Sequence, residues 1–280
     1  MVLDVVLSVI ALIVLFIASF CDWKTREVPD WLNYGLIFAA LGIRSIFSIK
    51  LGWNILLSGA LGFLVFFLIA MLFYRLRQWG GGDSKLLMGM GAVIGISLPF
   101  DSSSLSLLWF FFSLLFLGSI YGLCWMFYVA IKEKKVFLKE FRSQLSGWKT
   151  QVGLGTLSLT FVSLGLVQTF LWYFAIFPIV FYYLFNFVTA VERSCFVKDV
   201  SIDKLTEGDW LVKDVIWDDK VVLKKKTLES DDLKKLYQLK AKVARVTIKE
   251  GIPFIPSFLL AYLMLLFGKD LFTWFLGILF

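Results

Sequence analysis

The sequence is dominated by apolar runs that are long enough to cross a lipid bilayer. Hydrophobic residues make up 59% of the 280 residues and charged residues 18%, whereas soluble domains carry about 25% charged residues. One folded core cannot cover this much apolar surface, so the chain requires lipid as its solvent. Backbone groups in lipid must be satisfied within the segment itself, which favours helices. We therefore predict an all-α polytopic membrane protein.

The apolar runs predict about eight membrane spans. An apolar block at residues 152–191 is too long for one crossing and is expected to form a transmembrane hairpin that turns near Val167–Leu171. The tail Leu271–Phe280 is too short to cross again and is expected to lie in the interface. Six further runs are predicted to cross once each: Val2–Phe20, Leu32–Ile49, Ile55–Tyr74, Leu86–Phe100, Leu105–Ile131 and Ile252–Gly268.

Polarity divides the chain into five regions. We expect a membrane core at 1–131, a basic loop at 132–151, the hairpin at 152–191, a polar module at 192–250, and a last span with its tail at 251–280.

The polar module has the pattern of a small α+β fold. Trp210–Trp217 and Val221–Lys226 flank Asp218–Lys220 and predict a β-hairpin. Ser230 opens a predicted helix that runs through Lys242, with acidic residues in its first turn, and Ala244–Lys249 is predicted to form a strand.

The distribution of Lys and Arg predicts the orientation in the membrane. Basic residues gather in segments 21–31, 75–85 and 132–149, which fall on one side if each run crosses once. The positive-inside rule places this side in the cytoplasm, so the N-terminus is expected outside and the polar module in the cytoplasm, with the protein in the plasma membrane. Arg44 lies near the outer end of the second span and is expected to extend to the interface.

Residue content excludes several chemistries. The chain has no His, which excludes Ser-His-Asp triads, Cys-His dyads and His-ligated zinc or haem. The three Cys form no CxxC motif and predict neither a zinc knuckle nor a disulfide framework. The net charge of +7 is expected to face anionic membrane lipid, and nucleic-acid binding is not expected.

Two acidic residues stand where spans meet the cytoplasm. Asp22 follows the first span, and Asp83 follows three glycines between the third and fourth spans. Alone, Asp83 is better explained as a helix cap, and Asp22 as an interfacial residue neutralised by Lys24 or Arg26. Together they suggest two carboxyls that share one proton. Such a pair can activate water and hydrolyse a peptide bond without a metal.

Three motifs resemble those of one family. Gly80-Gly81-Gly82-Asp83, with Lys85 two residues on, is similar to the GxGD motif of integral-membrane aspartic proteases. The segment Asp22–Asp30, Asp-x-Lys-x-Arg-x-Val-Pro-Asp, resembles the region around the first catalytic aspartate of type IV prepilin peptidases. The segment Gly251–Pro256 resembles the proline-rich start of that family's last helix, and the polar module looks like the archaeal preflagellin branch.

The resemblance implies an endopeptidase that cleaves the short basic leader of pilin-like or archaellin precursors at the cytoplasmic membrane face. Its fold would be a six-span core, to which this chain adds the hairpin. No metal or other cofactor is implied. Bacterial bifunctional members carry an additional domain and also methylate the new N-terminus; no such domain lies between the first two spans, so we expect a protease without methyltransferase activity.

The resemblance also implies a role for particular residues. Asp22 and Asp83 would be catalytic, and the acidic residues Glu27 and Asp30 would favour the approach of a basic leader. The remaining residues would shape the loop (Gly80, Gly82), support it (Lys85) or line the site (Pro253, Phe254, Pro256).

Three alternatives remain open at this point. A protease like presenilin or signal-peptide peptidase would cut inside a substrate's span, but its first aspartate lies deep in a helix. An ion-coupled transporter would place both acids near the midplane, within repeated halves. A membrane scaffold would use the polar module to bind a partner, with Asp22 and Asp83 far apart.

Overall fold

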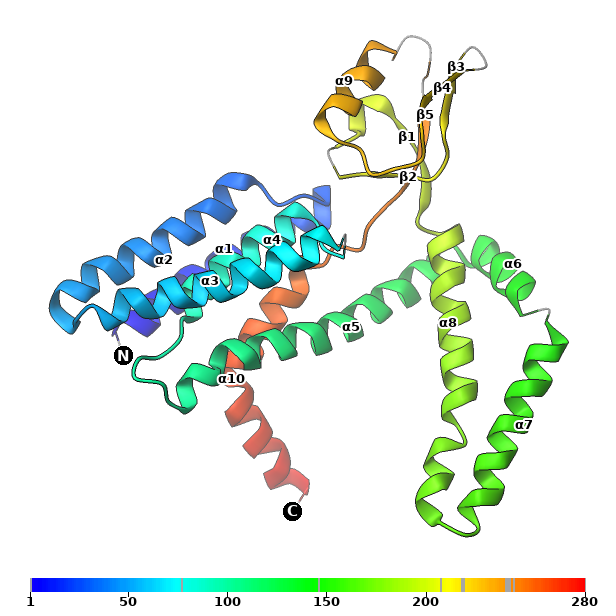
Figure 1. The fold of residues 1–280 in the computed structure, drawn as a ribbon, viewed down its shortest axis with the longest axis horizontal. Helices are drawn as coiled ribbons and strands as arrows, with labels where there is room; N and C mark the ends of the chain where they lie inside the picture. The colour runs from blue at the N-terminus through cyan, green and yellow to red at the C-terminus, as the bar shows by residue number, and fades with distance from the viewer. Residues whose placement is uncertain are drawn as a thin grey trace. The chain divides into compact units, whose positions relative to one another are not determined.

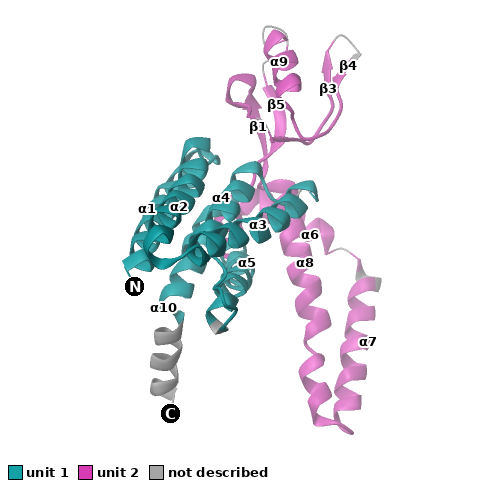
Figure 2. Ribbon diagram, turned by 60° about the vertical axis from the view of Figure 1, so that its left-hand side comes forward, with its two compact units in different colours: residues 1–123, 252–280 teal, residues 124–251 magenta. Residues whose placement is uncertain are grey.

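The computed structural model describes residues 2–76, 78–145, 147–206, 208–217, 220–239, 243 and 245–279. The chain divides into two compact units, one of residues 1–123 and 252–280 and the other of residues 124–251 (Figures 1 and 2). Helices dominate both units, and among the residues described strands occur only in the second.

The first unit is a helical bundle around one apolar core. Leu15, Leu36, Phe66, Leu87 and Phe258 are among the fully buried side chains of this core. The chain forms the elements α1 (Val2–Thr25), α2 (Asp30–Leu51), α3 (Asn54–Arg75), α4 (Gly81–Ile94), η1 (Ser102–Leu105), α5 (Ser106–Lys132) and α10 (Ile255–Leu279).

Five helical segments of the described chain are long and apolar enough to cross a membrane, as expected of a multi-pass membrane protein. They are Val2–Thr25, Asp30–Leu51, Asn54–Arg75, Ser103–Lys132 and Thr169–Ser194. The predicted count of about eight is therefore not confirmed. Helix α4 ends at Ile94, so the predicted fourth span Leu86–Phe100 is helical over only part of its length. Within α10, the stretch whose side chains the structure describes, Ile255–Gly268, is apolar but shorter than the five spans.

Helices α3 and α4 pack with their backbones in close contact. A Cβ atom added to Gly62 would overlap the carbonyl oxygen of Gly91, and one added to Gly91 would overlap that of Gly62. Only glycine allows this approach. The pair fixes the position of α4, the helix on which Asp83 lies.

Arg44 of α2 is buried rather than extended to the interface, so that expectation was wrong. Its side chain is 5% exposed. Nε donates to the carbonyl of Ala92 at 2.9 Å, and Nη2 donates to the carbonyls of Val93 at 2.7 Å and Ile94 at 3.2 Å. A cation at this place satisfies the unpaired carbonyls at the C-terminus of α4 and complements its dipole.

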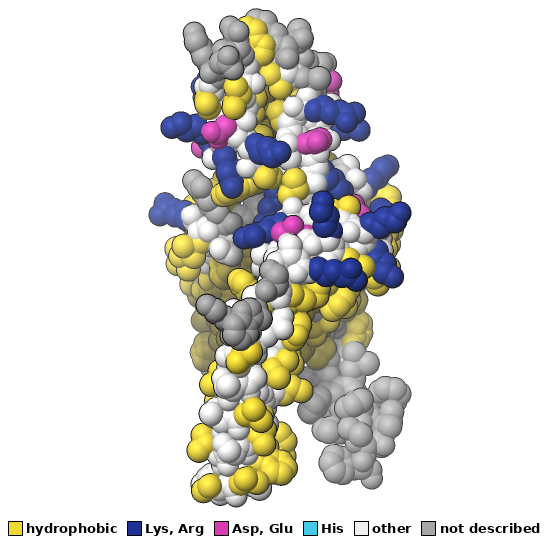
Figure 3. Space-filling model, turned by 90° about the vertical axis from the view of Figure 1, so that its right-hand side faces the viewer, with side chains coloured by type: hydrophobic (Ala, Val, Ile, Leu, Met, Phe, Trp, Pro, Cys, Tyr) yellow, Lys and Arg dark blue, Asp and Glu magenta, His cyan; other side chains and the backbone are white. Residues whose placement is uncertain are grey.

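The second unit begins with the end of α5 and continues with α6 (Lys134–Gln144), which lies in the region predicted to be a basic loop. The aromatic face of α6 explains why this region is helical, since Phe137 stacks on Phe141 and makes an edge contact with Phe187. A helical hairpin follows, made of α7 (Trp148–Gly165), η2 (Thr169–Phe174) and α8 (Phe177–Ser194). Hydrophobic side chains predominate along it, and Lys and Arg gather above it (Figure 3).

The polar module has two small antiparallel sheets. Strands β1 (Val197–Ser201), β5 (Arg245–Lys249) and β2 (Trp210–Leu211) form one sheet in the order β1-β5-β2, and β3 (Val215–Trp217) pairs with β4 (Lys220–Leu223). The predicted strand Trp210–Trp217 is thus divided between two sheets. The turn residues Asp218 and Asp219, the predicted helix end at 240–242 and Ala244 lie outside the described residues.

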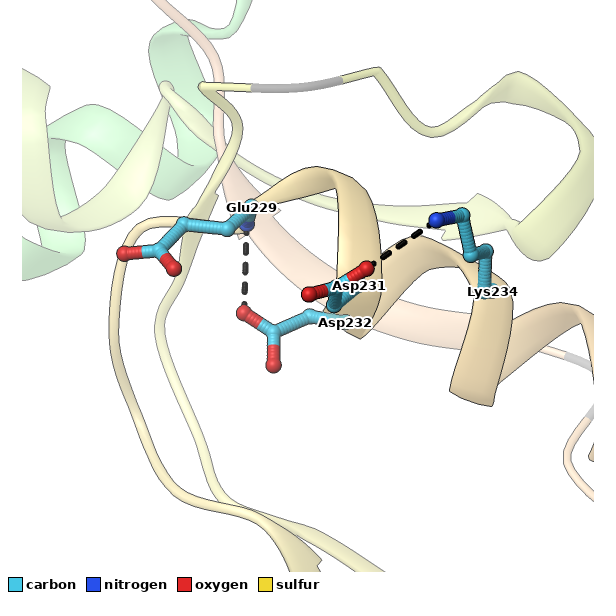
Figure 4. A network of polar contacts seen from close by, with 4 residues as sticks. All are labelled: Glu229, Asp231, Asp232 and Lys234. Atoms are coloured by element: carbon cyan, nitrogen blue, oxygen red, sulfur yellow. Dashed lines mark hydrogen bonds and ion pairs between the residues drawn. The ribbon is translucent and has the colours of Figure 1, made fainter.

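A short 3-10 helix, η3 (Ile202–Lys204), and the helix α9 (Ser230–Gln238) complete the module. The start of α9 is held by its own acids. The carboxylate of Asp232 accepts the N–H of Glu229 at 3.1 Å, and Lys234 binds Asp231 at 3.0 Å (Figure 4). This arrangement satisfies an N–H group at the helix N-terminus.

Replacing Arg44 with Met should lower the free energy of unfolding by about 1–3 kcal/mol, because buried carbonyls at the end of α4 lose their donors. Thermal unfolding in detergent micelles measures this loss. Lys50→Met, which makes the same substitution at an exposed position of α2, is the matched control and should change little. Equal melting temperatures for the two variants would contradict the role of Arg44.

Candidate active site

Asp22 lies in the last turns of α1 rather than after the first span. The helix continues past the predicted end at Phe20 to Thr25, and Asp22 is only 6% exposed. The helix then ends on Arg26, whose φ of 62° is left-handed and whose N–H donates to the carbonyl of Asp22 at 2.9 Å. This conformation costs a non-glycine residue roughly 1–2 kcal/mol.

The carboxylate of Asp22 is bonded to the start of the last helix. Oδ2 accepts the backbone N–H of Ile255 at 2.9 Å, and Ile255 is the first residue of α10. The N–H groups of a first helical turn have no partner within the helix, and the N-terminal end of the dipole favours an anion. Asp22 therefore caps α10 from a position 233 residues away in the sequence.

Asp83 lies in the first turn of α4. Gly80 precedes the helix, so Asp83 is its third residue and not the cap residue of the alternative explanation. Its Oδ2 accepts the N–H of Gly80 at 3.3 Å. Gly80 has no side chain to return a hydrogen bond, so only one half of a capping box is present.

The two carboxyls lie within electrostatic range of each other. Asp83 is outside the five candidate spans, and burial raises the pKa of Asp83 to about 7, with a further contribution from the negative charge of Asp22. Two acids in this relation titrate as a coupled pair.

The glycines before Asp83 do not have left-handed backbones. Gly80 has φ −72° and ψ 168°, which other residues also adopt. A Cβ added to Gly80 would come no closer than 3.7 Å to Asp83 Oδ2, and one added to Gly81 would lie 4.0 Å from the ring of Tyr74. At Gly82 the nearest atom would be Val28 Cβ at 3.5 Å. The fold therefore tolerates small side chains here, and their absence leaves room beside Asp83.

Lys85 connects the starts of α4 and α2. Its Nζ binds Asp30 Oδ1 at 2.6 Å and lies 5.3 Å from the ring centre of Tyr34. The hydrogen bond to Asp30 raises the pKa of Lys85, so Lys85 stays protonated. Asp30 is the first residue of α2 and has its charge balanced by Lys85, whereas Glu27 is exposed.

Trp79, Phe73, Phe254 and Phe258 form an aromatic group. Trp79 lies four residues before Asp83, and Phe254 precedes Ile255, the hydrogen-bond partner of Asp22. Trp79 stacks on Phe73 with ring centres 4.7 Å apart and lies 5.9 Å from both Phe254 and Phe258. Pro253 is buried and Pro256 partly buried at the start of α10. The motifs did not single out Trp79. Its position immediately before the glycines was the available signal.

The fold thus places two acids from different helices, α1 and α4, within electrostatic range of each other. Comparison with known proteins shows which family this part of the chain resembles. Residues 9–127, which include Asp22 and Asp83, match the type IV leader peptidase family. This match confirms the family resemblance predicted from the motifs.

Individual relatives agree with the family match. The chain is 37% identical over 86 residues to a preflagellin peptidase of Methanococcus voltae, and 32% identical over 85 residues to one of Methanococcus maripaludis. A preflagellin peptidase of Methanocaldococcus jannaschii is 33% identical over 87 residues. The matches cover 29–31% of this chain and 35–37% of the relatives. The similarity thus spans little more than a third of each relative.

Asp83→Asn should stabilise the protein at pH 8.5 and have a smaller effect at pH 5. The pKa of Asp83 is about 7 in the folded protein and 3.8 ordinarily, so the folded state binds the proton of Asp83 more tightly than the unfolded state does. The contribution of Asp83 to the free energy of unfolding therefore falls as the pH rises from 3.8 to 7, and it stays lost above pH 7. Asn carries no charge and avoids this loss. Thermal unfolding of both proteins at the two pH values measures the difference, and a pH-independent difference would contradict the raised pKa.

Proposed function

We propose that this protein is a membrane aspartic endopeptidase that removes the short basic leader from archaellin-like or pilin-like precursors at the cytoplasmic face of the plasma membrane. The family match of residues 9–127 and the names of the similar proteins, preflagellin peptidases, support this proposal. The N-terminus would lie outside and the polar module in the cytoplasm, as the basic segments favour. No methyltransferase activity is proposed.

The observation that carries the proposal is the electrostatic coupling of Asp22 with Asp83. The two acids come from different helices, α1 and α4, and 61 positions separate them in the sequence. Near neutral pH the pair contains one carboxylate and one carboxyl, which are the base and the acid that peptide hydrolysis needs.

The reaction can be written with the two carboxyls alone. The carboxylate takes a proton from water while the water oxygen bonds to the peptide carbon, and the carboxyl gives its proton to the carbonyl oxygen. The resulting gem-diol then collapses: the first acid protonates the amide nitrogen, the C–N bond breaks, and the second acid takes back a proton from one hydroxyl. Both groups end in their starting states.

Substrate recognition would depend on charge and on the aromatic group. The exposed Glu27 gives a negative charge near Asp22 for a basic leader, and Trp79 with Phe254 gives an apolar surface for the hydrophobic helix that follows it. The glycines beside Asp83 would let an extended peptide backbone approach.

Asp22→Asn and Asp83→Asn should each lower precursor cleavage by about 10²–10⁴-fold, because each removes one partner of the acid-base pair. Asp101→Asn is the matched control, since Asp101 is an exposed acid at the start of η1. Mass spectrometry of the products from purified enzyme and precursor measures the rate and maps the cut bond. Substantial cleavage by either site variant would reject the proposed pair, and a cut inside the apolar helix would indicate an intramembrane protease instead.

Glu27→Lys should slow cleavage of a precursor with a basic leader several-fold and should affect a neutral-leader precursor less. The effect should weaken in high salt, because an exposed charge is screened. Initial rates at low and high ionic strength test this. Equal slowing of both precursors would remove the electrostatic role of Glu27 and leave the aspartate pair untouched.

A further inference from the structure

The two aspartates have different environments, although both lie near a helix N-terminus. Asp22 is buried on α1 and accepts the N–H of Ile255 at 2.9 Å from a second helix, α10. Asp83 accepts the N–H of Gly80 at 3.3 Å from the start of its own helix, and this bond is the longer of the two. A shorter bond to a carboxylate stabilises its negative charge more strongly.

The charges around Asp22 add to this difference. Burial disfavours the negative charge of Asp22, whereas the N–H groups of Ile255 and Phe254 and the positive charge of Arg26 favour it. Tyr121 on α5 also lies within electrostatic range. Asp83 on α4 is the acid within electrostatic range of Asp22. For Asp83, burial and the charge of Asp22 both disfavour ionisation, and the N–H of Gly80 alone opposes them.

We infer that the N-terminus of α10, through the backbone N–H of Ile255, keeps Asp22 as the ionised member of the pair, so that Asp22 is the general base and Asp83 the general acid. The inference rests on the proposed function and assigns the order of events within it. Asp22 takes the proton from the attacking water, and Asp83 gives its proton to the peptide carbonyl oxygen. Asp22 then protonates the leaving nitrogen, and Asp83 recovers a proton from the gem-diol. Ile255 acts through Asp22 and is a positioning residue.

Ile255→Pro is the variant that removes the N–H. Proline is well tolerated at the first position of a helix, where its missing N–H has no partner within the helix. Ile255→Ala is the matched control: it shortens the same buried side chain and retains the N–H. A second pair of variants, at Gly80, tests the hydrogen bond to Asp83. The backbone of Gly80 suits proline, so Gly80→Pro removes the N–H that Asp83 accepts, and Gly80→Ala retains it.

The readout is the pH dependence of kcat/KM for a precursor peptide, with wild-type and variant enzymes in the same detergent. The active form holds one proton, so the profile is bell-shaped, and its acidic limb follows the acid that ionises first. We expect Ile255→Pro to move the acidic limb upward by about one pH unit, as loss of one hydrogen bond to a charge implies. Ile255→Ala should leave both limbs in place, and Gly80→Pro should raise the basic limb.

Each outcome decides the assignment. An upward shift of only the basic limb in Ile255→Pro would show that Asp22 is the acid, and unchanged limbs would show that the N–H of Ile255 has no part. If Ile255→Pro does not fold, the Gly80 pair decides: a shift of the acidic limb in Gly80→Pro overturns the assignment, and a shift of the basic limb supports it. Retained cleavage by Asp22→Asn would reject the proposed function itself, whereas unshifted limbs with an inactive Asp22→Asn reject only this inference.

Discussion

The hydrogen bond from the N–H of Ile255 to the carboxylate of Asp22 is the contact on which the arrangement of the candidate site depends. A carboxylate that is 6% exposed is costly to ionise unless it is bonded, and the first N–H groups of a helix are equally costly to bury without an acceptor. The carboxylate at the end of α1 thus gains a donor, and the N–H group at the start of α10 gains an acceptor. The contact fixes the start of α10 beside the end of α1, and the aromatic group of Trp79 and Phe254 follows from the same placement.

Helix α4 is held at both ends and along its length, which is why Asp83 has a defined position. Lys85 joins its first turn to Asp30, Arg44 binds its last carbonyls, and Gly91 packs directly on α3. The three contacts come from different parts of the preceding chain. A helix of this length carries little stability by itself, so tertiary contacts of this kind account for its order.

Much of the helical architecture follows from the sequence, because an apolar run of span length leaves few options for a backbone in lipid. The bounds of α2 and α3 differ from the predicted spans by one or two residues at each end. The prediction was poorer where a contact with a distant part of the chain determines burial or secondary structure. Arg44 was assigned to the interface because its acceptors lie about 50 residues on. The region of α6 was predicted to be a loop because the partner of its Phe face, Phe187, lies about 50 residues on, in the second helix of the hairpin.

The candidate site, like the fold, could be predicted from the sequence only in part. Local motifs pointed to Asp22 and Asp83, and their catalytic role stays a prediction. The motif Gly251–Pro256 contains Ile255, but no sequence pattern indicates that its N–H bonds to Asp22. The separation of 233 residues between Asp22 and Ile255 also has a consequence for biosynthesis. Residue 255 is translated 233 residues after Asp22, so Asp22 has to wait in the bilayer without this partner until α10 is inserted. A shortened chain that lacks α10 would carry both aspartates and still lack the assembled centre.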